Sequence, residues 1–107
     1  MEYFGATSKL AKLLSSERNL IKEYGKKEAA GISKRLEEFR LADNLAMISH
    51  LPPSKLHKLR GDRDRQFAVW ITENYRLVFE AYDIDDVQTT DKAKAVTISI
   101  IGIEDYH

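Results

Sequence analysis

The chain has 107 residues, of which 43% are hydrophobic and 32% are charged. These proportions are those of a globular domain and exclude a disordered tail. Lysine and arginine number 17 and aspartate and glutamate also 17, so the net charge is zero and argues against a strong nucleic-acid binder. The absence of cysteine excludes disulfide bonds and thiolate metal sites. No apolar run reaches membrane-spanning length, so we expect one cytoplasmic domain over residues 1–107, with no membrane partner.

The first half of the chain predicts helices after a short strand. Residues 1–4 favour a strand that ends at Gly5, and Thr7 is a good helix N-cap. Apolar residues then recur at helical spacing over 10–24 and 29–39. The remaining expectations are a split at Ser15–Ser16, a left-handed end at Gly25, and a short helix over 45–48 before Pro52–Pro53.

The second half changes to the period of two that is typical of strands. Residues 67–71 and 75–79 alternate on either side of a short turn, which predicts a β-hairpin. Residues 83–94 form a polar loop, and residues 95–101 are rich in β-branched side chains. The expected fold class is α+β, with N-terminal helices packed on one face of a small, mainly antiparallel sheet.

A basic segment precedes and enters this hairpin. Residues 53–79 hold six basic and three acidic side chains, whereas residues 80–107 hold two basic and seven acidic ones. Such a local patch can bind phosphates even in a neutral chain. The basic side chains before the hairpin are Lys55, Lys58, Arg60, Arg63 and Arg65.

Three further features can carry chemistry. His57 lies between two leucines that could fix its backbone, although it could equally be a solvated loop histidine. Arg76 lies in mid-strand, where it could hold a phosphate bidentately or form an ion pair with Glu80 or a loop aspartate. The closing residues Asp105, Tyr106 and His107 suit acid–base work, although such a tail is often frayed and inert.

Other site types lack support in the sequence. There is no paired-cysteine or His-x-x-x-His spacing for a metal, and no glycine-rich phosphate loop. No serine occupies a nucleophile-elbow motif. We therefore expect no cofactor and no metal.

Taken in order, these motifs resemble one family. LPPSKLHKLRGDRDRQFAVWITENYRLVFEAYD with a terminal EDYH resembles the HigB-type, "plasmid maintenance killer protein" branch of the RelE-like toxins, over most of the chain. The resemblance implies a RelE-like toxin fold and a toxin that cleaves mRNA on the translating ribosome. It also implies metal-independent attack by the ribose 2′-OH, and neutralisation by a HigA-type helix-turn-helix antitoxin in a toxin–antitoxin hetero-oligomer.

The resemblance assigns catalytic roles to matching positions. Two histidines, His57 and His107, share the general base and general acid work, in an order that the sequence leaves open. Asp105 orients an imidazole, Tyr106 stacks on a base or positions the phosphate, and Arg76 offsets developing charge with help from Lys58 and Arg60.

Two departures from the family pattern leave alternatives open. Many relatives have basic or polar residues where this chain has Phe67-Ala68-Val69-Trp70, although Trp70 could stack a base. The zero net charge is the other departure. The alternatives are a catalytically weak or inactive relative that binds and regulates through an antitoxin, and a ParE-type toxin that inhibits gyrase.

Overall fold

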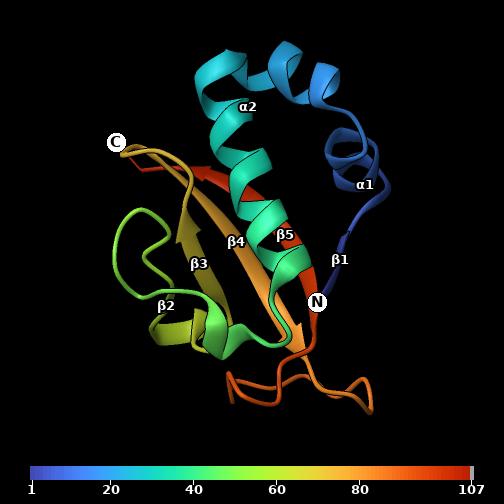
Figure 1. Ribbon diagram of the computed structural model, residues 1–107, viewed down its shortest axis with the longest axis vertical. Helices are drawn as coiled ribbons and strands as arrows, with labels where there is room; N and C mark the ends of the chain where they lie inside the picture. The colour runs from blue at the N-terminus through green and yellow to red at the C-terminus, as the bar shows by residue number, and fades with distance from the viewer. Residues whose placement is uncertain (107) are drawn as a thin grey trace.

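The computed structural model describes residues 1–106 and confirms the α+β class. Two helices precede most of the strands and pack on a five-stranded sheet (Figure 1). No helix within residues 1–106 combines the length and apolar character needed to cross a membrane. The elements in chain order are β1 (Glu2–Gly5), α1 (Ser8–Leu14), α2 (Glu17–Leu41), η1 (Leu45–Met47), β2 (His57–Lys58), η2 (Gly61–Arg63), β3 (Phe67–Trp70), β4 (Tyr75–Tyr82) and β5 (Thr97–Asp105).

The sheet has the strand order β1-β5-β4-β3-β2. The pairs β2–β3, β3–β4 and β4–β5 are antiparallel, whereas β1 lies parallel to β5. The predicted hairpin is confirmed, with Phe67 opposite Phe79 and Trp70 opposite Arg76. The parallel pairing places the first strand, β1, at one edge of the sheet beside the last strand, β5 (Figure 1).

The helix starts follow from local capping. Thr7 accepts a hydrogen bond from the Leu10 backbone N–H at 3.1 Å, and Ser16 accepts one from Asn19 at 3.3 Å. The predicted split at Ser15–Ser16 is therefore confirmed. Gly25 has φ 85° and ψ 169°, a conformation open essentially to glycine alone, and it interrupts the helical geometry inside α2. The predicted stripe over 10–24 is thus divided between α1 and the first part of α2, and the stripe over 29–39 lies in α2 after Gly25.

The main core lies between α2 and one face of the sheet. Phe39 of α2 packs edge-on against Phe79 of β4 at 5.1 Å between ring centroids, and Phe67 stacks on Phe79 at 5.7 Å. All three rings are fully buried. A Cβ at Gly31 would lie 2.5 Å from the carbonyl oxygen of Ile71, so glycine permits this close approach of α2 to the sheet.

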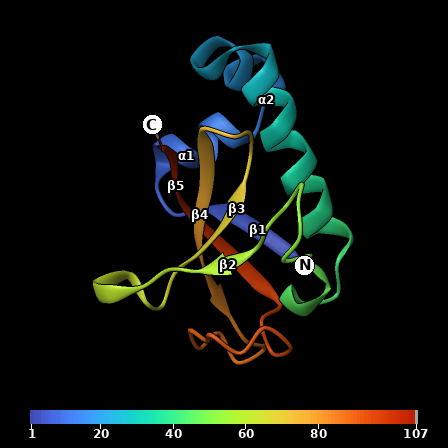
Figure 2. The same cartoon turned by 90° about the vertical axis from the view of Figure 1, so that its left-hand side faces the viewer.

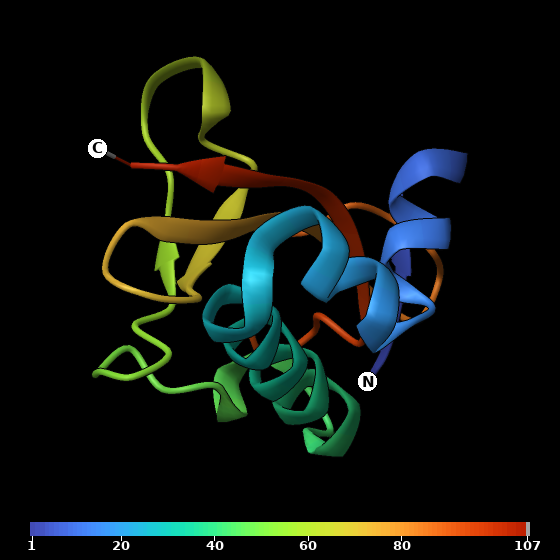
Figure 3. The ribbon, with the colours of Figure 1, turned by 90° about the horizontal axis from the view of Figure 1, so that it is seen from above.

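The opposite face of the sheet carries a smaller apolar cluster. Leu59 packs there on Ala68 and Val78, with Ile101 at the margin. In the view from above, α2 lies on one side of the sheet, and the loop that follows β2 reaches over the other (Figure 3). The two leucines on either side of His57 are Leu56 and Leu59, and their exposed fractions of 2% and 9% confirm that they anchor this segment.

Three details differ from the expected elements. Residues 57–58 form strand β2 where a loop was expected, because their backbone pairs with Ala68 and Phe67. The short helix at 45–48 is a 3₁₀ turn over Leu45–Met47. The last strand runs from Thr97 to Asp105, beyond the predicted 95–101, and a bulge places one extra residue, Ile101, opposite the junction of Val78 and Phe79.

Candidate functional site

Two rows of side chains cross the face of the sheet opposite α2. Paired residues in an antiparallel sheet lie on the same face, so Trp70, Arg76 and Glu104 form one row across three strands. His57, Ala68, Val78 and Gly102 form the next row. Four of the sequence-predicted residues, His57, Trp70, Arg76 and Tyr106, thus gather on or beside this face.

Arg76 is the centre of this face. Its Nη1 donates to the carbonyl oxygens of Thr72 (2.9 Å), Glu73 (2.9 Å) and Tyr75 (3.1 Å), so the hairpin turn holds the guanidinium in place. The residue is 8% exposed. Burial lowers the pKa of the guanidinium while the nearby Tyr106 raises it, and arginine keeps its charge throughout the physiological range. Backbone carbonyls therefore hold this side chain, in place of the ion pair with Glu80 considered above.

Two aromatic rings flank the guanidinium. The carbon at its centre lies 4.4 Å from the Trp70 ring centroid and 5.1 Å from that of Tyr106. Tyr106 is 43% exposed, and its backbone N–H donates to Asn74 O at 2.5 Å. Lys55 Nζ also lies over Trp70, at 4.4 Å. The face thus combines two cations with two rings, a composition suited to phosphates and unstacked bases.

The support for Trp70 and Lys55 comes from the buried end of α2. Arg35, 4% exposed, donates from Nη1 to Ser54 Oγ at 2.6 Å, and Ser54 Oγ donates to Glu38 Oε1 at 2.7 Å. The carbonyl of Ser54 accepts the backbone N–H of Trp70 at 2.7 Å. One serine therefore joins α2 to the first strand of the hairpin, which fixes the segment from Lys55 to His57.

His57 has a defined tautomer in this arrangement. Its Nδ1 lies 2.9 Å from the carbonyl oxygen of Lys55, which can only accept a hydrogen bond. Nδ1 therefore carries the proton, and the lone pair of the neutral ring is on Nε2. The ring is half-buried, so its second nitrogen can exchange a proton with a ligand on this face.

Arg63 and Glu104 join the loop after β2 to strand β5. Arg63 donates to both carboxylate oxygens of Glu104, at 3.1 and 2.5 Å, and to Gln66 Oε1 at 3.0 Å. The bonds with Glu104 raise the pKa of Arg63. Sequence reasoning included Glu104 only as part of the terminal EDYH motif and gave it no role of its own. The signal that could have found it is its pairing with Arg76, which requires knowledge of the bulge in β5.

The other basic residues of the predicted patch, Lys58, Arg60 and Arg65, lie away from the Arg76 face. Lys58 Nζ donates to Asp64 O at 2.9 Å, and Arg65 Nη2 donates to Gln88 O at 3.1 Å. Both line a polar cavity of about 470 Å³ beside Thr89. Arg60 is exposed at the start of η2. The five predicted phosphate-binding cations are thus divided between the Arg76 face and the edge of the sheet.

The predicted acid–base tail is also divided. Asp105 pairs with Tyr75, whose ring packs against the main core, so the strand register places Asp105 on the face of the sheet opposite to Arg76. Tyr106 lies on the Arg76 side. His107 lies outside the described residues. Within residues 1–106, no group of three or more histidine, aspartate and glutamate side chains could hold a metal ion.

Comparisons with known proteins identify the fold. Neither a protein-family model nor a curated protein matches the sequence. A YoeB/ParE toxin from Agrobacterium tumefaciens aligns over 100% of this chain and 100% of its own, with a TM-score of 0.61 and 13% identity. A YoeB dimer structure from Staphylococcus aureus aligns over 100% of this chain and 97% of that one, with a TM-score of 0.55 and 16% identity. The chain therefore has the fold of YoeB/ParE toxins.

Proposed function

We propose that residues 1–107 form a single HigB-type toxin domain, one component of a type II toxin–antitoxin pair, and that it cleaves mRNA on the ribosome. The shared fold with YoeB/ParE toxins supports the toxin class. The observation that carries the enzymatic proposal is Arg76, held by three backbone carbonyls beside two aromatic rings on the face of the sheet opposite α2.

Binding follows from the composition of that face. A scissile phosphate lies against the Arg76 guanidinium, which offsets the charge that develops on its oxygens. Trp70 and Tyr106 stack on the neighbouring bases, which single-stranded RNA presents unstacked. Lys55 adds a second cation beside Trp70.

The reaction needs two proton transfers. The ribose 2′-oxygen attacks the adjacent phosphorus, the bond to the 5′-oxygen breaks, and the products are a 2′,3′-cyclic phosphate and a 5′-hydroxyl. His57 Nε2 takes the proton of the 2′-OH, since its Nδ1–H is already donated to Lys55 O. In this proposal His107, the second histidine of the resemblance, takes the remaining role and supplies the proton to the leaving 5′-oxygen.

The partner implied by this class is an antitoxin. We propose a HigA-type helix-turn-helix protein that binds the toxin in a hetero-oligomer. A helix-turn-helix reading frame beside the gene and co-purification of its product would support this pairing.

The direct test maps RNA ends. The chain is induced in a bacterial host, and new 5′ ends on translated mRNAs are compared with those from His57→Ala and His107→Ala variants. His50→Ala is the matched control, because His50 is exposed and outside the Arg76 face. We expect cuts that require translation, survive His50→Ala and fall at least about hundredfold in the other two variants. Cuts that persist in both of them would contradict the mechanism.

A second candidate is a toxin relative that binds its antitoxin without cutting RNA. The observation in its favour is that Asp105 lies on the opposite face from Arg76, so the full predicted catalytic set does not converge. Under this candidate, induction gives no new RNA ends while antitoxin binding remains. Growth arrest with altered DNA supercoiling and intact mRNA would instead indicate a gyrase-directed toxin.

A further inference from the structure

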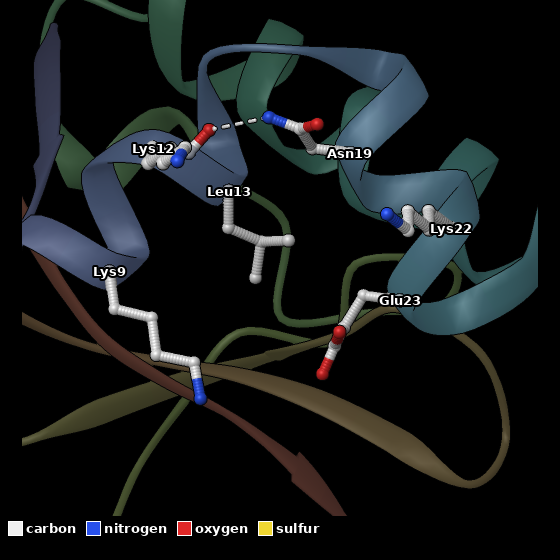
Figure 4. A pocket seen from close by; sticks show the side chains of 6 residues that line it. All are labelled: Lys9, Lys12, Leu13, Asn19, Lys22 and Glu23. Atoms are coloured by element: carbon white, nitrogen blue, oxygen red, sulfur yellow. Dashed lines mark hydrogen bonds between the residues drawn. The ribbon is translucent and has the colours of Figure 1, made fainter.

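A groove between α1 and α2 combines an apolar floor with a basic rim. It has a volume of about 320 Å³ and is lined by Lys9, Lys12, Leu13, Asn19, Lys22 and Glu23. Figure 4 shows Leu13 in the middle of the groove, with three lysines, Asn19 and Glu23 around it. Asn19 Nδ2 donates to Lys12 O at 3.1 Å and so holds the two helices at a set separation (Figure 4).

The loop after β4 has the complementary composition. Residues 83–87 read Asp-Ile-Asp-Asp-Val. Ile84 is 87% exposed and Val87 is 58% exposed, which makes Ile84 the most exposed large apolar side chain among the described residues. Asp85 and Asp86 are exposed beside them. An apolar tip between carboxylates matches a leucine floor whose rim carries three lysines against one carboxylate, Glu23, and is therefore basic on balance.

The loop holds this shape through its own hydrogen bonds. Asp83 Oδ1 accepts from the backbone N–H groups of Asp85 (2.9 Å) and Val87 (3.0 Å). The backbone N–H of Asp83 also donates to Val87 O at 2.9 Å. Such a preorganised loop loses little conformational freedom when it binds.

The groove and the loop cannot meet within one molecule. The molecule measures 35 Å along its longest axis, and both side views place the loop at one end and the beginning of α2 at the other (Figures 1 and 2). We propose that the 83–87 loop of one copy docks in the α1–α2 groove of a second copy, in a head-to-tail contact. This inference does not depend on the proposed function, because neither surface includes the Arg76 face.

The contact has two physical consequences. It joins unlike surfaces, so each copy keeps a free groove or a free loop, and association continues into chains unless a ring closes. Its small size and exposed charges make it weak and sensitive to salt. The weight-average mass should therefore rise with concentration at low salt and fall back toward 12.3 kDa in high salt.

The test is sedimentation equilibrium of the whole chain at about 20 mM and about 500 mM NaCl, where screening differs strongly. The groove variant carries Lys12→Glu and Lys22→Glu, which place an acidic groove against the acidic loop. The loop variant carries Asp85→Lys and Asp86→Lys, which place a basic loop against the basic groove. We expect self-association of each variant to weaken at least tenfold. Lys26→Glu with Lys27→Glu is the control, since it changes the same charge on α2 outside the groove. It should associate like the parent.

Mixing provides the decisive arm. The acidic groove of the first variant fits the basic loop of the second, and the unaltered groove of the second fits the unaltered loop of the first. We therefore expect the mixture to associate although neither variant does so alone. A parent chain that stays monomeric at low salt up to about 1 mM would overturn the proposal. So would a mixture that stays monomeric while circular dichroism shows both variants folded.

Discussion

Arg76 has two tasks that use different parts of one side chain. Its Nη1 closes the turn between β3 and β4 through three carbonyl oxygens, and its planar group lies between the rings of Trp70 and Tyr106. A lysine keeps the charge but has one nitrogen and no planar group. It cannot satisfy the turn and present charge to a phosphate at the same time.

We expect Arg76→Lys to lower mRNA cleavage by about 10²-fold, because the lysine charge is no longer held in position against the phosphate in the transition state. The turn also loses hydrogen bonds, which should cost about 1–2 kcal/mol of unfolding free energy. Cleavage is measured at a temperature where circular dichroism shows the variant folded. Arg18→Lys, at an exposed position on α2 away from the Arg76 face, is the control and should cleave normally. Cleavage by Arg76→Lys at the parental rate would show that Arg76 does not act on the phosphate.

At the scale of single elements, the sequence was sufficient for features set by neighbouring residues and insufficient for a strand that forms only by pairing. The cap at Thr7, the split at Ser15–Ser16 and the hairpin after Phe67 are local features, and all were predictable. A break at Gly25 was predictable too, although its ψ of 169° differs from the left-handed helix end that was expected. Strand β2 was missed because its two residues become a strand only through pairing with β3.

The set of side chains on the Arg76 face depends on the bulge in strand β5. Simple alternation from Ile100 would place Glu104 and Tyr106 on the core face and Asp105 on the other. The extra residue at Ile101 reverses this order, so Glu104 pairs with Arg76, and Asp105 pairs with Tyr75. The candidate residues could be chosen from the sequence, but the face that each one occupies could not.

Deleting Ile101 should therefore be milder than deleting Ile103. Without Ile101 the residues from Gly102 onward keep their partners on β4, so Glu104 still meets Arg63. Without Ile103 the next residue, Glu104, moves to the core-facing position opposite Leu77, where its charge is buried without a partner. We expect the first variant to fold with a lower melting temperature and the second to fail to fold cooperatively. Equal melting temperatures in the two variants would show that β5 can slip past the bulge.

At the scale of the whole molecule, two tyrosines couple stability to alkaline pH. Burial raises the pKa of Tyr24 above 10.0, with smaller contributions from Glu23 and Tyr75. Burial, followed by Glu80, also raises the pKa of Tyr82 above 10.0. Below pH 10 these phenols are neutral in both the folded and the unfolded chain. Above it the unfolded chain loses its protons first, so folding stability declines as pH rises toward the raised values.

We therefore expect the urea midpoint of unfolding to fall between pH 9 and pH 11, and to fall less in a Tyr24→Phe, Tyr82→Phe double variant. Phenylalanine keeps the ring, and with it the packing of residue 24 on Tyr75 at 6.1 Å between centroids. A decline of the same size in the double variant would assign the alkaline loss to other groups.

The separation of charge along the molecule has a practical consequence for its purification. Residues 8–35 carry eight basic and three acidic side chains, residues 80–94 at the opposite end carry two basic and five acidic ones, and the net charge of the whole chain is zero (Figure 1). A protein at its isoelectric point is normally expected to pass through ion-exchange columns. At about 10 mM salt the electrostatic screening length is about 30 Å, which is comparable with the 35 Å length of the molecule. The end of the molecule that touches a resin of opposite charge is therefore attracted more strongly than the far end is repelled. The chain should be retained near pH 7 on both a cation and an anion exchanger, in opposite orientations.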